Sequence, residues 1–153
     1  MSKARGRVGV DTNVLVYAVN ESSVFNSGTR KLLKKLIREK TQIIITWQNL
    51  TEFYAIVTDK KRFPRPMSPL ETAKYIGSCL DGGEYGLVLP NVQTGSGFLR
   101  MIKRVKPVGQ RIYDVFLAAT LVSNGVERLI TGNKKDFAGI AGLEAVGMDE
   151  FKV

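Results

Sequence analysis

Four acidic residues of this 153-residue chain stand in apolar surroundings, where a carboxylate is unfavourable unless something compensates its charge. Asp11 follows directly on the apolar stretch 8–10, and the other three are Glu52, Asp114 and Asp136. A carboxylate withdrawn from water needs a cationic partner or a metal ion. The whole chain carries a formal net charge of +9. An acidic, metal-binding pocket on a basic body predicts phosphodiester chemistry on nucleic acid.

Three of these acids also have an ordinary structural explanation. Asp11 could cap the helix that follows it. Asp114 could be stabilised in the first turn of its helix, where the helix dipole favours an anion. Asp136 could cap a short turn after a strand, although Asn133 beside it could offer an amide oxygen to a metal. No single acid is decisive, and their joint occurrence in this order is what favours a site.

Glu52 has the weakest support from periodicity. Its helix carries an apolar stripe formed by Leu50, Phe53, Tyr54 and Val57. On a helical wheel Glu52 lies about 150° from the centre of that stripe. The pattern therefore predicts a solvated charge, and only a second contact face shared with Ala55 and Ile56 would turn it inward.

The rest of the chain alternates short apolar stretches with amphipathic segments. The predicted strands cover residues 8–10, 43–47, 87–89, 128–131 and 143–146. The predicted helices cover residues 12–20, 27–40, 48–59, 68–80, 96–106 and 112–123. This alternation predicts an α/β fold: a single domain over residues 1–153, with a parallel sheet of about five strands flanked by helices. Ligands of such sheets gather beyond the carboxyl ends of the strands, where Asp11 and Thr131 both fall.

Cap residues predict where helices begin. Ser68 and Glu71 have the spacing of a capping box. Ser27 or Thr29 is expected to cap the second helix. Residues 112–123 are apolar on nearly every side, which predicts a buried helix.

Composition excludes several kinds of site. The chain has no histidine, which rules out histidine-based triads and histidine-rich zinc sites. Its single cysteine, Cys79, excludes an internal disulfide and fits a reducing compartment, most simply the cytoplasm. No apolar run approaches the about 20 residues needed to span a bilayer, so we expect no membrane association. The 23 Lys and Arg against 14 Asp and Glu favour an anionic partner.

Two basic loops could hold a nucleic-acid backbone. The first contains Lys60, Lys61, Arg62 and Arg65, with Phe63 among them for base stacking. The second covers residues 106–111 and brings Arg111 close to Asp114. Either loop could equally be a solvated surface, and Arg111 is favoured by its proximity to the acid.

Taken together, the motifs resemble those of the PIN domain, the nuclease fold that includes the VapC-type toxins of prokaryotic toxin–antitoxin pairs. Residues 8–13, 49–54, 112–119 and 129–137 are similar to the four motifs of the family, in order. The resemblance covers essentially the whole chain. The third and fourth motifs, separated by a helix that ends in Asn124, Gly125 and Val126, are the most specific.

The resemblance implies a ribonuclease that cleaves single-stranded or structured RNA and leaves a 5′-phosphate. It implies that Asp11, Glu52, Asp114 and a residue of the last motif surround one or two Mg²⁺ or Mn²⁺ ions. It thereby overrides the pattern-based expectation for Glu52. Many members carry Asp where this chain has Asn133, so a second metal ion should bind weakly unless Asp136 compensates.

The expected mechanism assigns a role to each residue. Asp11 and Asp114 would hold the ion directly, with Asp136 and Asn133 as further ligands; oxygen ligands with retained waters suit Mg²⁺ or Mn²⁺. The ion would lower the pKa of a bound water and offset charge in the transition state. Glu52 would orient that water or accept its proton. Supporting hydrogen bonds would come from Thr12, Asn13 and Thr131.

Two rival functions are weighed against this one. A haloacid-dehalogenase-like phosphatase also uses an Asp after the first strand, but it needs a second Asp where this chain has Asn13. A catalytically weak or inactive PIN-like module would bind RNA or protein without cleaving it. Asn133 is the best support for the module, and the retained acids oppose it. Metal-dependent cleavage that is lost in Asp11→Asn would separate enzyme from module.

The resemblance also implies protein partners. VapC-type members form homodimers and are inhibited by a small antitoxin whose tail enters the acidic groove. The apolar helices within residues 48–80 could provide such surfaces, since an apolar stripe can serve a partner as readily as a core.

Overall fold

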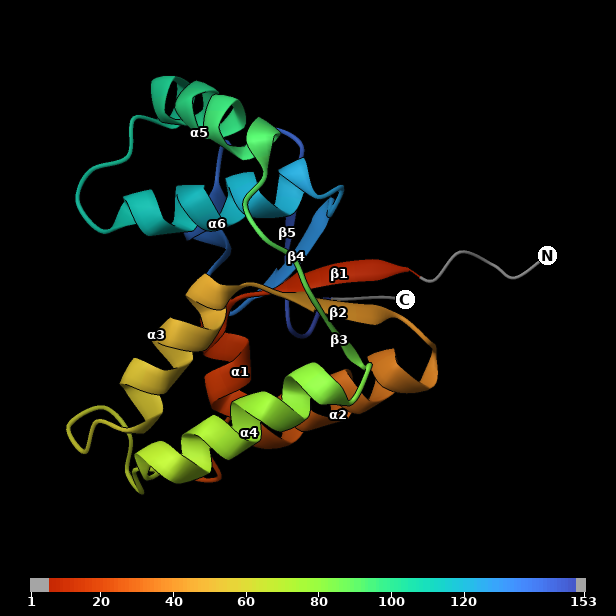
Figure 1. Ribbon diagram of the computed structural model, residues 1–153, viewed down its shortest axis with the longest axis vertical. Coiled ribbons are helices and arrows are strands. Elements are labelled where there is room, and N and C mark those ends of the chain that lie inside the picture. The colour runs from red at the N-terminus through yellow and green to blue at the C-terminus, as the bar shows by residue number, and fades with distance from the viewer. Residues whose placement is uncertain (1–5, 151–153) are drawn as a thin grey trace.

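The sheet of this protein is fully parallel and has five strands in the order β3-β2-β1-β4-β5. The computed structural model describes residues 6–150 (Figure 1), so the ends of the expected domain, 1–5 and 151–153, lie outside the described residues. The strands are β1 (Arg7–Val10), β2 (Gln42–Ile45), β3 (Tyr85–Leu87), β4 (Arg128–Thr131) and β5 (Glu144–Gly147). The helices are α1 (Thr12–Val19), α2 (Asn26–Arg38), α3 (Trp47–Val57), α4 (Pro69–Asp81), α5 (Val92–Val105) and α6 (Arg111–Ser123), with a short 3₁₀ helix η1 (Lys134–Phe137). The predicted α/β class is confirmed.

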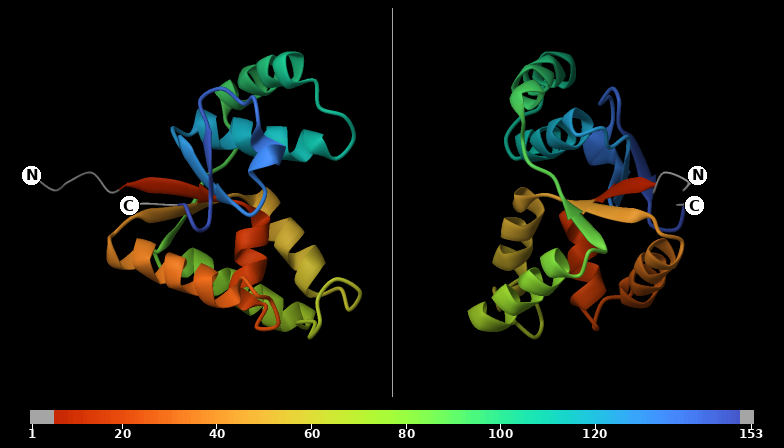
Figure 2. Two further views of the ribbon diagram at one scale, coloured as in Figure 1. Left: turned by 180° about the vertical axis from the view of Figure 1, so that it is seen from behind. Right: turned by 45° about the vertical axis from the view of Figure 1, so that its right-hand side comes forward.

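Helices cover both faces of the sheet, which explains why its central strands are almost entirely apolar. Helices α1 to α4 lie on one face, and α5 and α6 lie on the other (Figures 1 and 2). The first group packs around buried residues such as Val10, Ile43 and Phe53. The second group packs around buried residues such as Leu121 and Leu129. Because one core covers each face of the sheet, a site can lie only at its edge strands or beyond the ends of its strands.

The strand order creates a crevice at the carboxyl ends of β1 and β4. The chain moves outward from β1 through β2 to β3, then crosses back to place β4 on the other side of β1. A reversal of this kind separates the connections that follow the two strands, and ligands bind in the gap. The backbone N–H of Asp11 donates to Ile130 O at 2.9 Å, which keeps the end of β1 fixed to β4.

Side-chain caps account for most helix starts, and they correct two predicted boundaries. The predicted strand over 43–47 ends at Ile45, because Thr46 and Asn49 form a capping box that starts α3. Helix α5 begins at Val92 rather than residue 96, because the Asn91 side chain caps it. The strand expected at 87–89 lies at Tyr85–Leu87.

The predicted cap of the second helix is wrong. Helix α2 begins at Asn26 after Phe25, and no side chain caps it. Thr29 lies inside the helix on its buried face, and its hydroxyl donates to the Met148 sulfur at 3.3 Å. The predicted capping box of Ser68 and Glu71 is confirmed at the start of α4. No helix within residues 6–150 combines the length and apolar character that a membrane span requires.

The approach of α6 to the sheet depends on Gly9 in β1. A Cβ at this position would lie 3.0 Å from Leu121 Cδ1 and 3.2 Å from Leu121 Cδ2. Leu121 is fully buried between the helix and the sheet, so it has little room to move. Gly9 therefore lets the helix that carries Asp114 lie close to the strand that leads to Asp11.

We expect Gly9→Ala to destabilise the protein by about 1–3 kcal/mol, because the added methyl overpacks a filled core. Urea unfolding followed by circular dichroism measures the change. Gly77→Ala in α4 is the control, since a Cβ there meets nothing within 4 Å. That change should stabilise the helix by up to about 1 kcal/mol. Equal stability of Gly9→Ala and wild type would show that the strand–helix distance is not set at this position.

Candidate active site

Four acidic side chains from separate parts of the chain lie within electrostatic range of one another beyond the carboxyl ends of β1 and β4. Asp11 follows β1, Glu52 lies on α3, Asp114 lies on α6 and Asp136 lies in η1. Their charges act on one another: Glu52 and Asp136 both raise the pKa of Asp11. Asp11, Asp136 and Glu52 all raise the pKa of Asp114. Tertiary structure thus brings together the acids that the sequence separates by up to 125 positions, from Asp11 to Asp136.

Asp11 is buried, and hydrogen bonds fix both of its oxygens. Oδ1 accepts from the backbone N–H of Thr12 at 2.8 Å, and Oδ2 accepts from the Thr131 hydroxyl at 2.8 Å. The first contact caps α1, so the structural explanation of this acid also holds. Burial raises the pKa of Asp11 despite these hydrogen bonds, with repulsion from Glu52 and Asp136 adding to the rise. This carboxylate is held in place at a site that penalises its charge.

Glu52 turns inward, contrary to the prediction of a solvated charge from periodicity. Its Oε2 accepts from the Thr12 hydroxyl at 2.9 Å, and its Oε1 accepts from Gln48 Nε2 at 3.0 Å. The Asn49 side chain donates to the same Thr12 hydroxyl at 3.2 Å. Helix α3 therefore has a second contact face, on which Ile56 lies beside Glu52 along a cleft.

Sequence reasoning missed Gln48 and Asn49 as supporting residues. Gln48 Nε2 also donates to Tyr113 O at 2.9 Å, which joins α3 to α6. One available signal was the four-residue spacing of Gln48 and Glu52, which places both side chains on one helix face. Asn49 had a separate signal, because it stands three residues after Thr46 at the start of the helix. Neither spacing indicated the contact of Gln48 with α6.

Asp114 lies half-buried in the first turn of α6. Burial and then the three neighbouring acids raise its pKa to about 6, whereas the Arg111 guanidinium opposes that rise. Arg111 also donates to Ala138 O at 3.1 Å, which ties the start of α6 to the segment after η1. The expected closeness of Arg111 and Asp114 is thus present in the structure.

Two amide side chains contact the loop after β4: Asn133 within the loop and Asn13 in α1. Asn133 Nδ2 donates to Asp136 Oδ2 at 2.8 Å, and the Asn133 N–H donates to the Thr131 hydroxyl at 3.0 Å. Asn13 accepts from the Gly132 N–H at 3.2 Å. Asn13 therefore positions the backbone of this loop, whereas Thr12 and Thr131 contact carboxylates directly.

An open cleft of about 660 Å³ lies between α3, α6 and η1. Its lining includes Glu52, Asp114 and Asp136, together with the cationic Arg62 and Arg111. Acids at the site with cations beside them suit a phosphate backbone whose reacting group lies near a metal ion.

The residues of the basic loop after α3 lie on different surfaces of the protein. Arg62 lines the cleft, whereas Arg65 lines a different hollow beside Glu21; Lys60 and Lys61 are exposed. The prediction that Phe63 stacks on bases is wrong. Its side chain is only 5% exposed and packs in the core, because the turn folds back over the end of α3.

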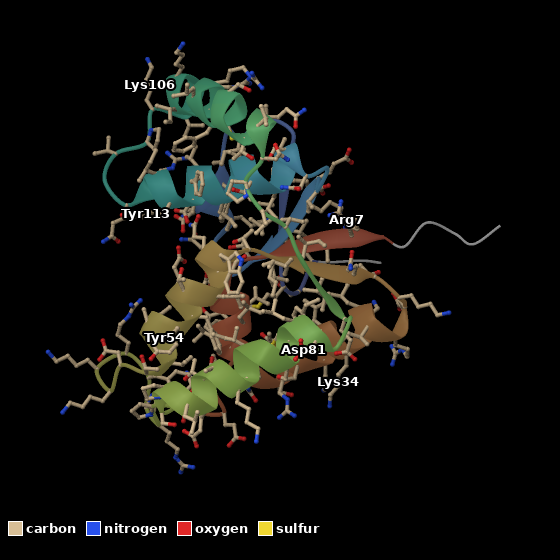
Figure 3. All side chains as sticks on the ribbon, in the orientation of Figure 1. Arg7, Lys34, Tyr54, Asp81, Lys106 and Tyr113 are labelled. Carbon is tan, nitrogen blue, oxygen red and sulfur yellow. The ribbon has the colours of Figure 1, made fainter. Side chains whose placement is uncertain are left out.

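An exposed aromatic residue that sequence reasoning missed lies at the cleft instead. Tyr113 projects from the first turn of α6 and is 58% exposed (Figure 3). It lines the same cleft as Glu52 and Asp114. Tyr54 projects from α3 on the same side of the molecule (Figure 3). The Tyr113 ring, rather than Phe63, is available to bases at the cleft.

The donor chemistry of this cluster fits a hard divalent cation. All four acids offer oxygen ligands, which Mg²⁺ and Mn²⁺ prefer. Burial raises the pKa of Asp11 and Asp114, and repulsion among the acids adds to the rise; a bound cation would offset both costs. Within residues 6–150, no three Asp, Glu or Cys side chains are placed so that together they could hold one metal ion. Mg²⁺ is usually held by one or two carboxylates with several retained waters, so a closed cage is not required.

Comparisons with known proteins agree with this geometry. The PIN domain family model matches residues 7–135, and the chain belongs to this family. It is 27% identical over 134 residues to Ribonuclease VapC37 of Mycobacterium tuberculosis (strain ATCC 25618 / H37Rv), covering 88% of this chain and 92% of that protein.

Two solved structures share the fold. One is VapBC2 from Rickettsia felis bound to a promoter DNA fragment, with a TM-score of 0.68 and 18% identity over 92% of this chain and 98% of that one. The other is a toxin–antitoxin complex from Klebsiella pneumoniae, with a TM-score of 0.63 and 19% identity over 94% of this chain and 99% of that one. At these identities the structures establish the arrangement of elements.

Asp114 should make the metal-free protein less stable as the pH rises. Its pKa of about 6 in the folded protein lies above the ordinary value of 3.8. The folded state therefore holds this proton more tightly than the unfolded chain does. The resulting stabilisation is complete below pH 3.8 and is lost as the pH rises through about 6.

In EDTA, Asp114→Asn should unfold at higher urea than wild type at pH 7, and at similar urea at pH 4. The Asn side chain has the same shape but carries no charge at either pH. Urea midpoints at the two pH values measure the difference. If wild type and Asp114→Asn had equal urea midpoints at each pH, the burial and repulsion of this charge would be too weak to affect the stability of the protein.

Proposed function

We propose that this protein is a divalent-metal-dependent ribonuclease that hydrolyses RNA phosphodiester bonds and acts as a VapC-type toxin. The observation that carries the proposal is the convergence of Asp11, Glu52, Asp114 and Asp136 at the carboxyl ends of β1 and β4. Membership of the PIN domain family and similarity to a VapC ribonuclease over most of the chain support it.

Asp11 and Asp114 are the proposed direct ligands of Mg²⁺ or Mn²⁺. A bound divalent ion supplies the charge that activates water and offsets negative charge developing on the phosphate. Thr131 and the Thr12 N–H hold the Asp11 oxygens, so this ligand is oriented before an ion arrives. Asp136 is the proposed further ligand, with Asn133 holding one of its oxygens.

Glu52 is the proposed acceptor of the proton from the attacking water. The Thr12 hydroxyl and the Gln48 amide each hold one of its oxygens, which fixes the direction of the carboxylate. A positioned acceptor of this kind needs to lie within hydrogen-bond reach of the water that it deprotonates. Glu52 lines the cleft beside Asp114 and Asp136, where the phosphate would lie.

Partners and location follow from the same reasoning. We propose a small antitoxin as the protein partner, since the fold is shared with a toxin–antitoxin complex. We also propose a homodimer. Three residues of the α3 stripe, Leu50, Phe53 and Val57, pack in the core. The apolar groups left for partners within residues 48–80 include Tyr54 and Leu70, which are 39% and 79% exposed. The RNA substrate and the free thiol of Cys79 fit the cytoplasm.

Asp11→Asn should abolish metal-dependent cleavage of single-stranded RNA. Replacing a supporting residue of a metal site costs about 10- to 100-fold in affinity or activity, so replacing a direct ligand should cost more. Cleavage of a labelled RNA in Mg²⁺ or Mn²⁺ measures the loss. A second measurement is the melting temperature, which Mn²⁺ should raise for wild type but not for Asp11→Asn.

Asp81→Asn is the matched control, because it removes the same charge from an exposed acid at the end of α4 (Figure 3). It should retain both cleavage and the response to Mn²⁺. RNA binding without turnover by the wild type, whatever the metal, would instead favour a non-catalytic PIN-like module.

Arg62→Ala should weaken RNA binding more than Arg65→Ala. Arg62 lines the acidic cleft and Arg65 does not, although the two lie three residues apart in one loop. Losing one phosphate contact should lower the slope of log affinity against log salt by about 1. Binding of a labelled RNA across a salt series measures that slope for each variant. Equal slopes for the two variants would show that the RNA does not pass through the cleft at Arg62.

A further inference from the structure

A second hollow lies beside the loop that carries Asn133. Its volume is about 640 Å³, which is in the range of small-molecule sites. Thr131, Gly132 and Asn133 line it, and residues of the α2 start and of the segment after β5 complete it. The acidic cleft reaches the same loop at Asp136. The chemistry proposed for the cleft leaves this neighbouring hollow without a role.

An exposed phenyl ring forms part of the hollow. Phe25, just before α2, is 50% exposed. Its ring packs on Tyr17 with centroids 4.9 Å apart. Tyr17 in turn lies against Gly132, where a Cβ would come within 3.3 Å of Tyr17 Cε2. The two rings are therefore held beside the loop that follows β4, with part of the Phe25 ring open to a ligand.

Charged groups of both signs also line the hollow. Lys134 Nζ bonds both oxygens of the Glu150 carboxylate, at 2.9 and 2.7 Å, which neutralises that acid. Lys135 contributes a further cation, and Asp149 contributes acceptor oxygens. A flat apolar ring, a cation and carboxylate acceptors are together what a nucleotide requires: stacking, a phosphate contact and partners for base amino groups.

We propose that this hollow, which we call the Phe25 pocket, binds the base of a nucleotide next to the scissile phosphate of single-stranded RNA. The pocket is defined by Phe25, Gly28, Asn133, Lys135, Met148 and Asp149. This inference rests on the proposed function. A strand whose phosphate lies among the acids continues past Asn133 into the pocket, because one loop borders both.

The pocket also predicts a preference among bases. The Asp149 carboxylate accepts hydrogen bonds but donates none when ionised. Guanine presents two adjacent donors to such an acceptor, its N1–H and its exocyclic amino group, whereas adenine and cytosine present the amino group alone and uracil presents N3–H alone. RNA with guanine at the pocket position should therefore be cleaved more efficiently than RNA with any of the other three bases.

The first test compares Phe25→Leu with Phe25→Trp. Leu keeps an apolar side chain but removes the stacking surface, and Trp retains it. Phe25→Leu should raise the KM for single-stranded RNA about 5- to 100-fold with little change in kcat, because base stacking contributes to binding on this scale. Phe25→Trp should remain near wild type. Leu99→Ala, an exposed apolar residue on the other face of the sheet, is the control.

The second test measures stacking directly and needs no turnover. RNA oligonucleotides carry 2-aminopurine at one position at a time, and each is titrated with Asp11→Asn or with Asp11→Asn/Phe25→Leu. Quenching at a single position that is lost in the double variant supports the pocket. No quenching at any position, or equal quenching in both proteins, overturns it.

The two proposals fail in distinguishable ways. If wild type cleaves RNA and Phe25→Leu has an unchanged KM whatever base occupies each flanking position, the pocket is overturned and the nuclease stands. If wild type cleaves no RNA but Phe25-dependent quenching at one position is present, the nuclease fails. The pocket then stands as a base-binding site.

Discussion

The confinement of several negative charges to one partly buried edge of the sheet is the constraint on which this protein depends. Asp11 is buried where β1 ends, and its charge is unfavourable there in spite of two hydrogen bonds. Asp114 approaches it on α6, and burial together with the neighbouring acids raises the pKa of Asp114 to about 6. A fold that tolerates this loss of stability preserves a site whose charges a bound cation would compensate. The proposed chemistry and the pH dependence of stability have this same origin.

The supporting hydrogen bonds make the site a property of several elements together. Thr12 begins α1 and holds Glu52 of α3, while Gln48 of α3 holds the backbone at Tyr113 in α6. Thr131 at the end of β4 holds Asp11. A shift of any one helix would therefore disturb carboxylates on the others. This connection explains why the close approach of α6 to β1 at Gly9 bears on the geometry of the site.

The loop after β4 has hollows of different character on its two sides. The cleft that contains Asp136 carries acids flanked by arginines, which suits a reacting phosphate and its metal ion. The Phe25 pocket carries an aromatic ring and mixed charges, which suits a base. One short loop thus lies between the cleft proposed to cleave the RNA backbone and the pocket proposed to bind a base. The hydrogen bond from the Gly132 N–H to the Asn13 side chain fixes this loop to α1.

The sequence by itself determined the order of elements and the α/β class, because these depend on local patterns. It pointed to the acids through their apolar surroundings and through the family resemblance, which alone supported Glu52. Apolar stretches short enough for buried strands lie between amphipathic segments, and Ser68 with Glu71 marks a helix start within four residues. Asp11 was found because a polar residue directly after a buried strand is visible in the chain. The position of Thr131 at the sheet edge followed from the same logic.

Only the tertiary structure decided which side chains meet, because contacts between distant elements leave no local pattern. Periodicity predicted an exposed Glu52, and the second face of α3 appeared only once α1 and α6 packed beside it. Phe63 looked like an exposed ring in a basic loop, yet the turn folds it into the core. Phe25 became part of a pocket because α2, the loop after β4 and the segment after β5 converge there. A sequence records the preferences of each segment, whereas burial and electrostatic coupling exist only when segments are assembled.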